Sequence, residues 1–382
     1  MLTRIRHLRR DERGMSFVYV GMGFMAFLAA TTLAIDVGMF MTGRSQAQNS
    51  ADAGALAGAV ALAFNDFNDR SAGGPAVQSA LNAARANVVI ASQVSVGPGD
   101  VTFPNDPTGQ PNRVKVDVFR TAGRGNPIPT IVGSLFGLQN VDIGATATAE
   151  ASPANAVRCP APFTIPDKWI EKQDPGGWSP NSTFDPGDVY IGPSDPVNYT
   201  GYDMNRDRGV QITLKADNDT KITASFYNPW DFPGSVGASD YRRNIAECDQ
   251  RSGFVLPNGV QLTPENGNMV GPTKQGMQDL IDLDPYASWD TTCKCVVGSD
   301  PKYNGNSPRI RPIPVYDPIA FADGKAHGKN ITLSEVTTIG FFIEPMKGGE
   351  VTGRIMPVHG VNDNNAGPAP PGSFPRLIRL VK

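Results

Sequence analysis

The stretch that decides the fold runs from Met15 to Phe64 and reads MSFVYVGMGFMAFLAATTLAIDVGMFMTGRSQAQNSADAGALAGAVALAF. Its first part, Met15–Ile35, is almost wholly apolar, and a helix of about 21 residues spans roughly 30 Å, the hydrocarbon thickness of a bilayer. The second part, Thr42–Phe64, has no proline and many strong helix formers, so the helix continues. The sequence therefore predicts one helix of roughly 75 Å that starts in a membrane and ends in a globular body.

The charges around the apolar run predict its orientation. Only Asp36 is charged between Gly14 and Gly43. The preceding tail, residues 1–13, contains Arg4, Arg6, Arg9, Arg10 and Arg13 against Asp11 and Glu12. Because clustered arginines stay on the cytoplasmic side, we expect residues 1–13 to form a cytoplasmic tail, residues 14–43 to span the membrane, and the chain after Arg44 to lie beyond it.

A cleaved signal peptide is the competing interpretation of this run. Signal peptides have apolar regions of about 7 to 15 residues and end at a small-residue cleavage site. The present run is longer, and no convincing A-x-A site ends it. The sequence therefore favours a retained anchor.

Three residues are candidates for helix interfaces. Asp36 lies near the far end of the span, where its carboxylate marks the membrane boundary or pairs with a partner helix inside the membrane. Gly54 and Gly58 form a G-x-x-x-G pair, which permits close approach of another helix. Packing within the chain and contact with a partner both fit the glycine pattern.

Composition limits the remaining possibilities. The chain has 382 residues, more than one core usually holds, so we expect two folded parts and an anchor. Its net charge of -3 and the absence of a basic patch beyond the N-terminus predict no nucleic-acid partner. The 41 glycines and 33 prolines favour loop-rich β structure in much of the body.

The pattern after Phe64 predicts two domains. Residues 44–152 are expected to form an extended helix and a pilin-like α+β domain, and residues 153–382 a β-rich domain in which Gly271–Asp282 is the one clear helix. Within the first domain the sequence predicts, in order, a helix over Pro75–Ser92, a hairpin of Val94–Phe103 with Arg113–Arg120, a helix over Pro129–Phe136 and a strand over Val141–Ala149. The fold class is therefore α+β.

The four cysteines are Cys159, Cys248, Cys293 and Cys295. An even number fits disulfides in an oxidising compartment, and the pairs at C-x2-C spacing that zinc sites use are missing. A bond between Cys293 and Cys295 would close a very small, strained ring. We therefore expect each of these two to bond to Cys159 or Cys248, with the pairing left open.

The sequence offers little catalytic chemistry. It has three histidines and no G-x-S-x-G elbow, H-E-x-x-H pair or Walker A loop, so we expect no catalytic, cofactor-binding or metal-binding residues and no enzyme activity. Asp203-Met204-Asn205-Arg206-Asp207 begins like a calcium loop, but Arg208 and Leu214 stand where an EF-hand needs Gly and Glu. An Asx turn is the expected structure there.

The run AIDVGMFMTGRSQAQNSADAGALAGAVAL, from Ala34 to Leu62, resembles the N-terminal signature of the TadE/TadG-like Flp pilus-assembly family. The features that match are the apolar span, the I-D-V-G and the Q-x-x-A-D-A-x-A-L-A-G segment. The resemblance implies a single-pass inner-membrane protein with a periplasmic body, which acts in adherence with other tight-adherence (Tad) pilus components or pilin-like subunits.

One departure from the family's cleaved members selects a branch. Processed pilins and pseudopilins of this system are cut after a Gly that is followed at the fifth mature position by Glu, and counting from Gly14 that position is Tyr19. The D-x-S-x-S motif of von Willebrand A domains is also missing. The resemblance thus favours a TadG-like protein without that domain. The alternatives are a minor pilin or pseudopilin within the pilus, or a stalked carbohydrate-binding or hydrolytic module.

Overall fold

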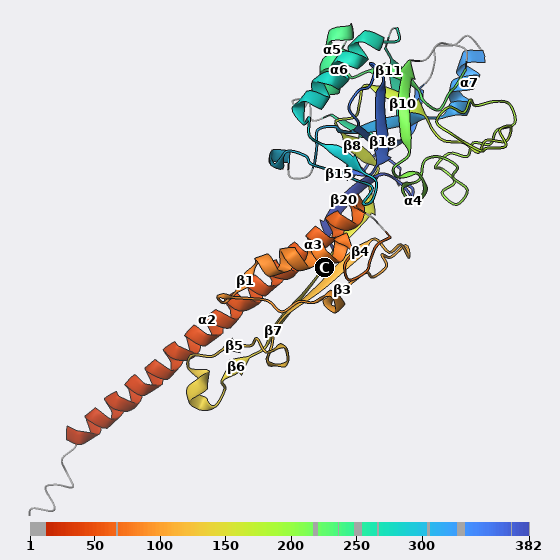
Figure 1. Ribbon diagram of the computed structural model, residues 1–382. Coiled ribbons are helices and arrows are strands. Elements are labelled where there is room, and N and C mark those ends of the chain that lie inside the picture. The colour runs from red at the N-terminus through yellow and green to blue at the C-terminus, as the bar shows by residue number, and fades with distance from the viewer. Residues whose placement is uncertain are drawn as a thin grey trace, which may run out of the picture.

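The computed structural model describes residues 13–65, 68–216, 221–235, 237–247, 254–265, 267–303, 306–326, 333–367 and 369–381. Figure 1 shows a long rod that carries a folded body at one end. The predicted basic tail, with Arg4, Arg6, Arg9 and Arg10, lies outside the described residues. So does Cys248.

The rod is helix α2, which runs unbroken for 52 residues from Arg13 to Phe64 and confirms the predicted single helix. At 1.5 Å per residue it is roughly 78 Å long. The side chains of residues 14–31 are exposed, whereas one face of residues 43–64 is buried by the rest of the chain. The helix therefore has an unpartnered apolar half and a packed half.

Helix α3, Pro75–Ala86, lies along the packed half of α2. Its buried stripe consists of Ala76, Val77, Ala80, Leu81 and Ala84. The sequence prediction was wrong beyond Ala86, because β1 (Val88–Val89) and β2 (Ser92–Gln93) form a tight hairpin there. Ile90 and Ala91 between them have φ of 46° and 60°, a left-handed turn that a helix cannot contain.

A seven-stranded sheet covers α2 and continues into the body. Its order is β12-β8-β19-β20-β7-β4-β3. The bounds are β3 Val101–Thr102, β4 Arg113–Arg120, β7 Ile143–Pro153, β8 Ala156–Arg158, β12 Val255–Pro257, β19 Val358–Val361 and β20 Pro375–Leu380. Alternate residues of β4 are buried, as its sequence predicts, and β3 pairs with it antiparallel in the predicted hairpin.

Strand β20 lies between strands that are far apart in the sequence, β7 and β19. It pairs antiparallel with β7, with Ile378 opposite Ala151, and its other edge pairs with β19. Ile378 also packs against the core that α2 and α3 form. A strand from the C-terminal region thus completes the sheet on which the N-terminal helix lies.

A loop between two short strands stands apart from the sheet. β5 (Ile128–Pro129) and β6 (Asn140–Val141) pair, and only a single 3-10 turn, Gly133–Phe136, lies between them. The predicted helix over Pro129–Phe136 was therefore wrong. Pro129 belongs to a strand, and Gly137 at φ 84° ends the turn, so one turn is all that fits.

The body contains a second seven-stranded sheet, of order β10-β18-β17-β13-β11-β9-β16. The bounds are β9 Phe163–Pro166, β10 Gln211–Ala216, β11 Phe226–Asp231, β13 Gln261–Pro264, β16 Ile310–Tyr316, β17 Leu333–Ile343 and β18 Val351–Met356. A separate hairpin is made of β14 (Ser288–Asp290) and β15 (Cys295–Val297). This β-rich content agrees with the predicted α+β class.

Helix α6, Val270–Leu283, confirms the helix predicted over Gly271–Asp282, with Met277, Leu280 and Ile281 buried. It is not the one clear helix of this part, because α5 (Gly237–Ala246) packs beside it. Two others are α4 (Met204–Asp207) and α7 (Pro318–Ala326). Helix α5 buries only Tyr241, Asn244 and Ile245, a stripe too narrow to stand out in its polar sequence.

Glu335 and Asp167 are two of the carboxyl groups enclosed in the body, and both have raised pKa values. Glu335 on β17 accepts a hydrogen bond from the N–H of Gly259 at 2.7 Å, and burial raises the pKa of its carboxyl to about 8. Burial also raises the pKa of Asp167 to about 6, although hydrogen bonds from the N–H of Tyr202 and the hydroxyl of Tyr199 act in the opposite direction. A buried carboxyl favours its neutral form because the low-polarity interior solvates charge poorly.

The raised pKa of Glu335 predicts that the body becomes less stable as pH rises. Between an ordinary pKa of 4.5 and about 8, the folded chain binds a proton that the unfolded chain has lost. The free energy of unfolding should therefore fall by up to about 1.4 kcal/mol per pH unit over this window. Urea unfolding at several pH values between 5 and 8 measures the slope. Glu335→Gln should reduce the slope most clearly above about pH 6, since Asp167 contributes below that pH, and Glu350→Gln at an exposed site should not reduce it; equal slopes in both variants contradict the assignment.

Candidate functional site

Helix α2 is held to the rest of the chain at three places, and the first is Asp36. Its carboxylate accepts hydrogen bonds from the N–H groups of Ile131 and Val132 at 3.0 Å and of Gly133 at 2.8 Å. Asp36 is 3% exposed. Gly133 is the first residue of the 3-10 turn, and Ile131 and Val132 precede it. Asp36 therefore binds N–H groups at the start of the turn that have no partner within it.

The sequence indicates that Asp36 is a boundary marker or a contact for a partner helix, and neither interpretation predicts these hydrogen bonds to the 130–139 loop. The capped residues lie almost a hundred positions further along the chain, and nothing near Asp36 signals them. The chain thus supplies a partner for the one charge between Gly14 and Gly43.

The second place is the close contact of α2 with α3 at Gly54 and Gly58. A Cβ atom added at Gly58 would lie 2.8 Å from Cγ1 of Val114 and 3.1 Å from Cβ of Ala80. One added at Gly54 would lie 3.1 Å from the carbonyl oxygen of Ala80. Both glycines are buried, so the helix that they admit is α3 of the same chain.

Polar residues of the same segment add specific hydrogen bonds. Oε1 of Gln46 accepts the N–H of Ile90 at 2.8 Å, and Oγ of Ser50 donates to the carbonyl of Ala84 at 2.7 Å. Gln48 donates to the carbonyl of Thr146 on β7 at 3.1 Å. These bonds fix the rotation of α2 relative to the β1–β2 hairpin, α3 and the sheet.

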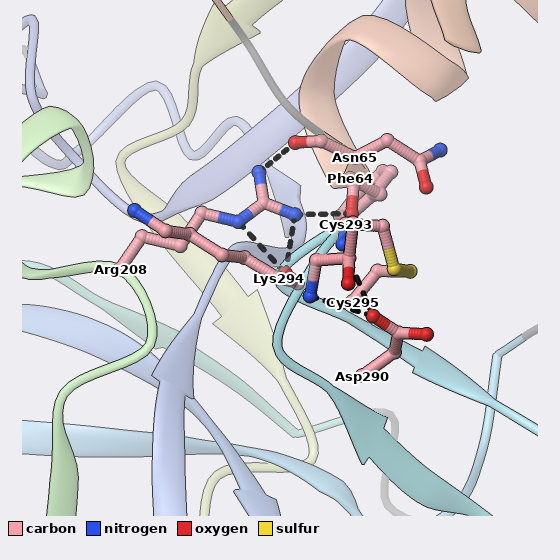
Figure 2. Close-up of a disulfide and its surroundings, with 8 residues drawn as sticks. Phe64, Asn65, Arg208, Asp290, Cys293, Lys294 and Cys295 are labelled. Carbon is pink, nitrogen blue, oxygen red and sulfur yellow. Dashed lines mark hydrogen bonds between the residues drawn. A yellow bond between two sulfur atoms is a disulfide. The ribbon is translucent and has the colours of Figure 1, made fainter.

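The third place is the C-terminal end of α2, where Arg208 of the body meets the last turn (Figure 2). Its guanidinium donates to the carbonyl oxygens of Phe64 and Asn65, and to that of Lys294 at 2.9 and 3.1 Å. The last carbonyls of a helix have no intrahelical partner, and a cation there also meets the negative end of the helix dipole. Arg208 therefore links the end of α2 to the β14–β15 hairpin.

The hairpin is closed by a disulfide that the sequence alone did not favour. Cys293 and Cys295 are bonded to each other, with their Cα atoms 5.2 Å apart, so the expectation that each pairs with Cys159 or Cys248 was wrong. Lys294 between them has φ of 49°, and this left-handed turn brings both sulfurs to the same side. Cys159 is also disulfide-bonded, while Cys248 lies outside the described residues.

A cavity of about 280 Å³ lies at this junction. Phe64, Val296, Met356 and His359 are among the residues that line it. The rings of Phe64 and His359 are 4.4 Å apart, and burial lowers the pKa of His359. The neutral imidazole acts here as a packing group against the end of α2.

The Asp203–Asp207 segment is occupied by contacts of its own. The carboxylate of Asp203 accepts the N–H of Asn205 at 2.8 Å and caps α4. Asp207 is 1% exposed and pairs with Lys168 and Arg206. Within the described ranges, no group of three or more His, Cys, Asp or Glu side chains is placed to hold a metal ion.

Two family models match the N-terminal part of the chain. The model described as TadE/G-like Flp pilus-assembly matches residues 14–61, and the one described as Tad-like Flp pilus-assembly matches residues 40–149. No curated protein and no solved structure matches the chain. The matched residues include Asp36, the loop that it caps, and both interface glycines, whereas the β-rich body lies outside the matches.

The glycine contact predicts that Gly58→Leu destabilises the fold. The new side chain would overlap Val114 and Ala80, at a cost of about 1–3 kcal/mol that a helix-propensity gain of about 1 kcal/mol offsets in part. Denaturant unfolding in detergent micelles measures the difference. Gly23→Leu is the matched control, since a Cβ there has no neighbour within 4 Å. Equal stability of the two variants would show that the contact is loose.

The Arg208 contacts predict that Arg208→Lys loosens the junction. Lysine keeps the charge but has no planar fork with which to reach three carbonyls. Loss of these charged hydrogen bonds should lower the free energy of local opening by about 1–2 kcal/mol. Amide hydrogen exchange in the last turn of α2 and in the β14–β15 hairpin should therefore accelerate about tenfold. The matched control is Arg243→Lys, where the arginine pairs with Asp240 on an exposed helix face. Unchanged exchange in Arg208→Lys would contradict the assignment.

Proposed function

We propose that this chain is a non-enzymatic component of Tad pilus assembly, because the TadE/G-like Flp pilus-assembly model matches residues 14–61 and the Tad-like Flp pilus-assembly model matches residues 40–149. In this proposal α2 anchors it as a single-pass protein in the bacterial inner membrane, and the body lies in the periplasm and serves adherence. The observation that carries the proposal is one unbroken helix with an apolar exposed half and a half bound into the body.

The exposed half of α2 supports the anchor. It contains an 18-residue window with mean hydropathy 1.9, none of which is buried. Large apolar side chains such as Phe17 and Met25 are 82% and 70% exposed, and a lipid environment favours such exposure. The arginines of residues 1–13 support a cytoplasmic N-terminus, and the Cys293–Cys295 bond suits the oxidising periplasm.

The two predicted domains have separate roles in this proposal. Residues 44–152, the extended helix with its pilin-like domain, stand in a fixed position above the membrane. Residues 153–382, the β-rich domain, contact other components. The outer face of α2 remains exposed at Arg44, Ser45, Asn49 and Val60, and this face is the proposed contact for pilin-like subunits or other Tad proteins.

Deletion of the chain in its bacterium should abolish Flp pili and surface adherence, scored by electron microscopy and an attachment assay. The wild-type chain and Gly23→Leu should restore both, whereas Gly58→Leu, with its disturbed α2–α3 contact, should restore them poorly. Normal piliation in the deletion strain would overturn the proposal.

Two further measurements test topology and processing. A cysteine at Val197, which is 88% exposed, should react with a membrane-impermeant maleimide once the outer membrane alone is opened. Mass spectrometry of the membrane fraction should recover a peptide that crosses Gly14–Met15, since Tyr19 replaces the Glu of cleaved subunits. A chain cut at Gly14 and found in sheared pili would instead identify a minor pilin.

A further inference from the structure

The loop that Asp36 caps carries an apolar patch. Within the 130–139 loop, the exposed fractions are 60% for Ile131, 81% for Leu135, 75% for Phe136 and 64% for Leu138. Single exposed apolar residues are common on soluble proteins, but four large ones in one short loop form a patch that needs a partner.

The position of this loop indicates what the partner is. The hydrogen bonds from Ile131, Val132 and Gly133 hold it against α2 at Asp36, close to the end of the apolar run. Figure 1 shows the loop between β5 and β6 as the part of the body nearest the N-terminal end of the rod. The patch therefore lies beside the segment that the proposed function puts in the bilayer.

The absence of charged residues from the loop supports the same placement. From Gly125 to Val141 the sequence contains no ionisable residue, and the nearest charges are Arg124 and Asp142 at the base of the loop. Arg124 pairs with Asp100 at 2.6 Å, away from the loop tip. Because this segment contains no charged side chain, its entry into lipid requires no desolvation of a charged group in the segment itself.

The backbone of the loop is also suited to a medium without water. In hydrocarbon every N–H needs an acceptor within the protein. Besides the three bonds to Asp36, Leu135 donates to Val132 at 3.0 Å, Leu138 to Gly133 at 2.9 Å and Thr130 to Gln139 at 3.1 Å. The hydroxyl of Ser134 donates to the carbonyl of Ile131 at 2.8 Å. The loop thus exposes apolar side chains while these donors find acceptors within the protein.

From these observations we propose that the 130–139 loop inserts into the periplasmic leaflet of the bilayer beside α2, so that the protein holds the membrane by two adjacent elements. Asp36 is then the tie between them. The insertion fixes the height of the body above the membrane and its rotation about α2, because two points of attachment remove the freedom that a single helix leaves. The inference rests on the proposed anchoring by α2.

Depth-dependent fluorescence quenching tests this with the full chain in phosphatidylcholine–phosphatidylglycerol vesicles. Separate variants Leu135→Cys and Leu138→Cys, labelled without reductant with an environment-sensitive fluorophore, report on the loop. Phe24→Cys is the reference within the span and Val197→Cys the exposed reference on the body. The wild-type chain treated in the same way gives the background from native cysteines.

The expected result is blue-shifted emission at positions 135 and 138, with quenching by lipids spin-labelled near the carbonyl end of the acyl chain at least about twofold above that at position 197. Quenching at position 24 but not at 135 or 138 would overturn the inference and leave the anchor intact. No quenching at any position would overturn both. A blue shift at 135 that lipid labels do not quench, and that weakens on dilution, would identify a second copy of the chain as the partner and also overturn the inference.

Discussion

The close contact of α2 with α3 and β4 is the constraint on which the rest of the structure depends. At Gly54 and Gly58 the helix backbone lies directly on its neighbours, and alanines along the same face, Ala51, Ala55 and Ala59, continue the contact. Small side chains have few rotamers to lose and leave little room for sliding, so the contact is stiff. A long helix held in this way transmits the orientation of its apolar half to the body.

The body follows the helix because two connections cross from one to the other. Arg208 binds the last carbonyls of α2 from the side of the β14–β15 hairpin, and β20 adds main-chain hydrogen bonds to β7. A hinge at the end of the helix would have to break both. Rod and body are therefore expected to move as one piece.

Local patterns in the sequence predicted much of this fold. The apolar run and the absence of proline predicted the long helix, and alternation at Val114, Val116 and Val118 predicted strand β4. The G-x-x-x-G pair located the helix contact, although its partner, α3, is visible only in the structure. These features are set within a few residues of one another, which is the range over which propensity and periodicity act.

The contacts that the sequence did not predict join distant residues or depend on one unusual backbone angle. The N–H groups that Asp36 binds lie just after β5, and that of Gly133 is 97 residues further along the chain. Arg208 lies 143 residues beyond Asn65, whose carbonyl oxygen it binds at the end of α2. The Cys293–Cys295 bond depends on the left-handed Lys294, which residue type alone does not indicate. Residue type and spacing gave no account of these sites because tertiary packing decides them.

The position of β20 has a consequence for biosynthesis. It separates β19 from β7 in the sheet, so without it the strands β7, β4 and β3 and the strands β12, β8 and β19 are two unconnected groups. All of α2, α3 and β7 precede it by more than two hundred residues of chain. During synthesis the helix-bearing part must therefore wait with an open sheet edge, which invites pairing with other chains, until residues 375–380 emerge. Late completion of the sheet delays the finished shape of this region until residues 375–380 have been made.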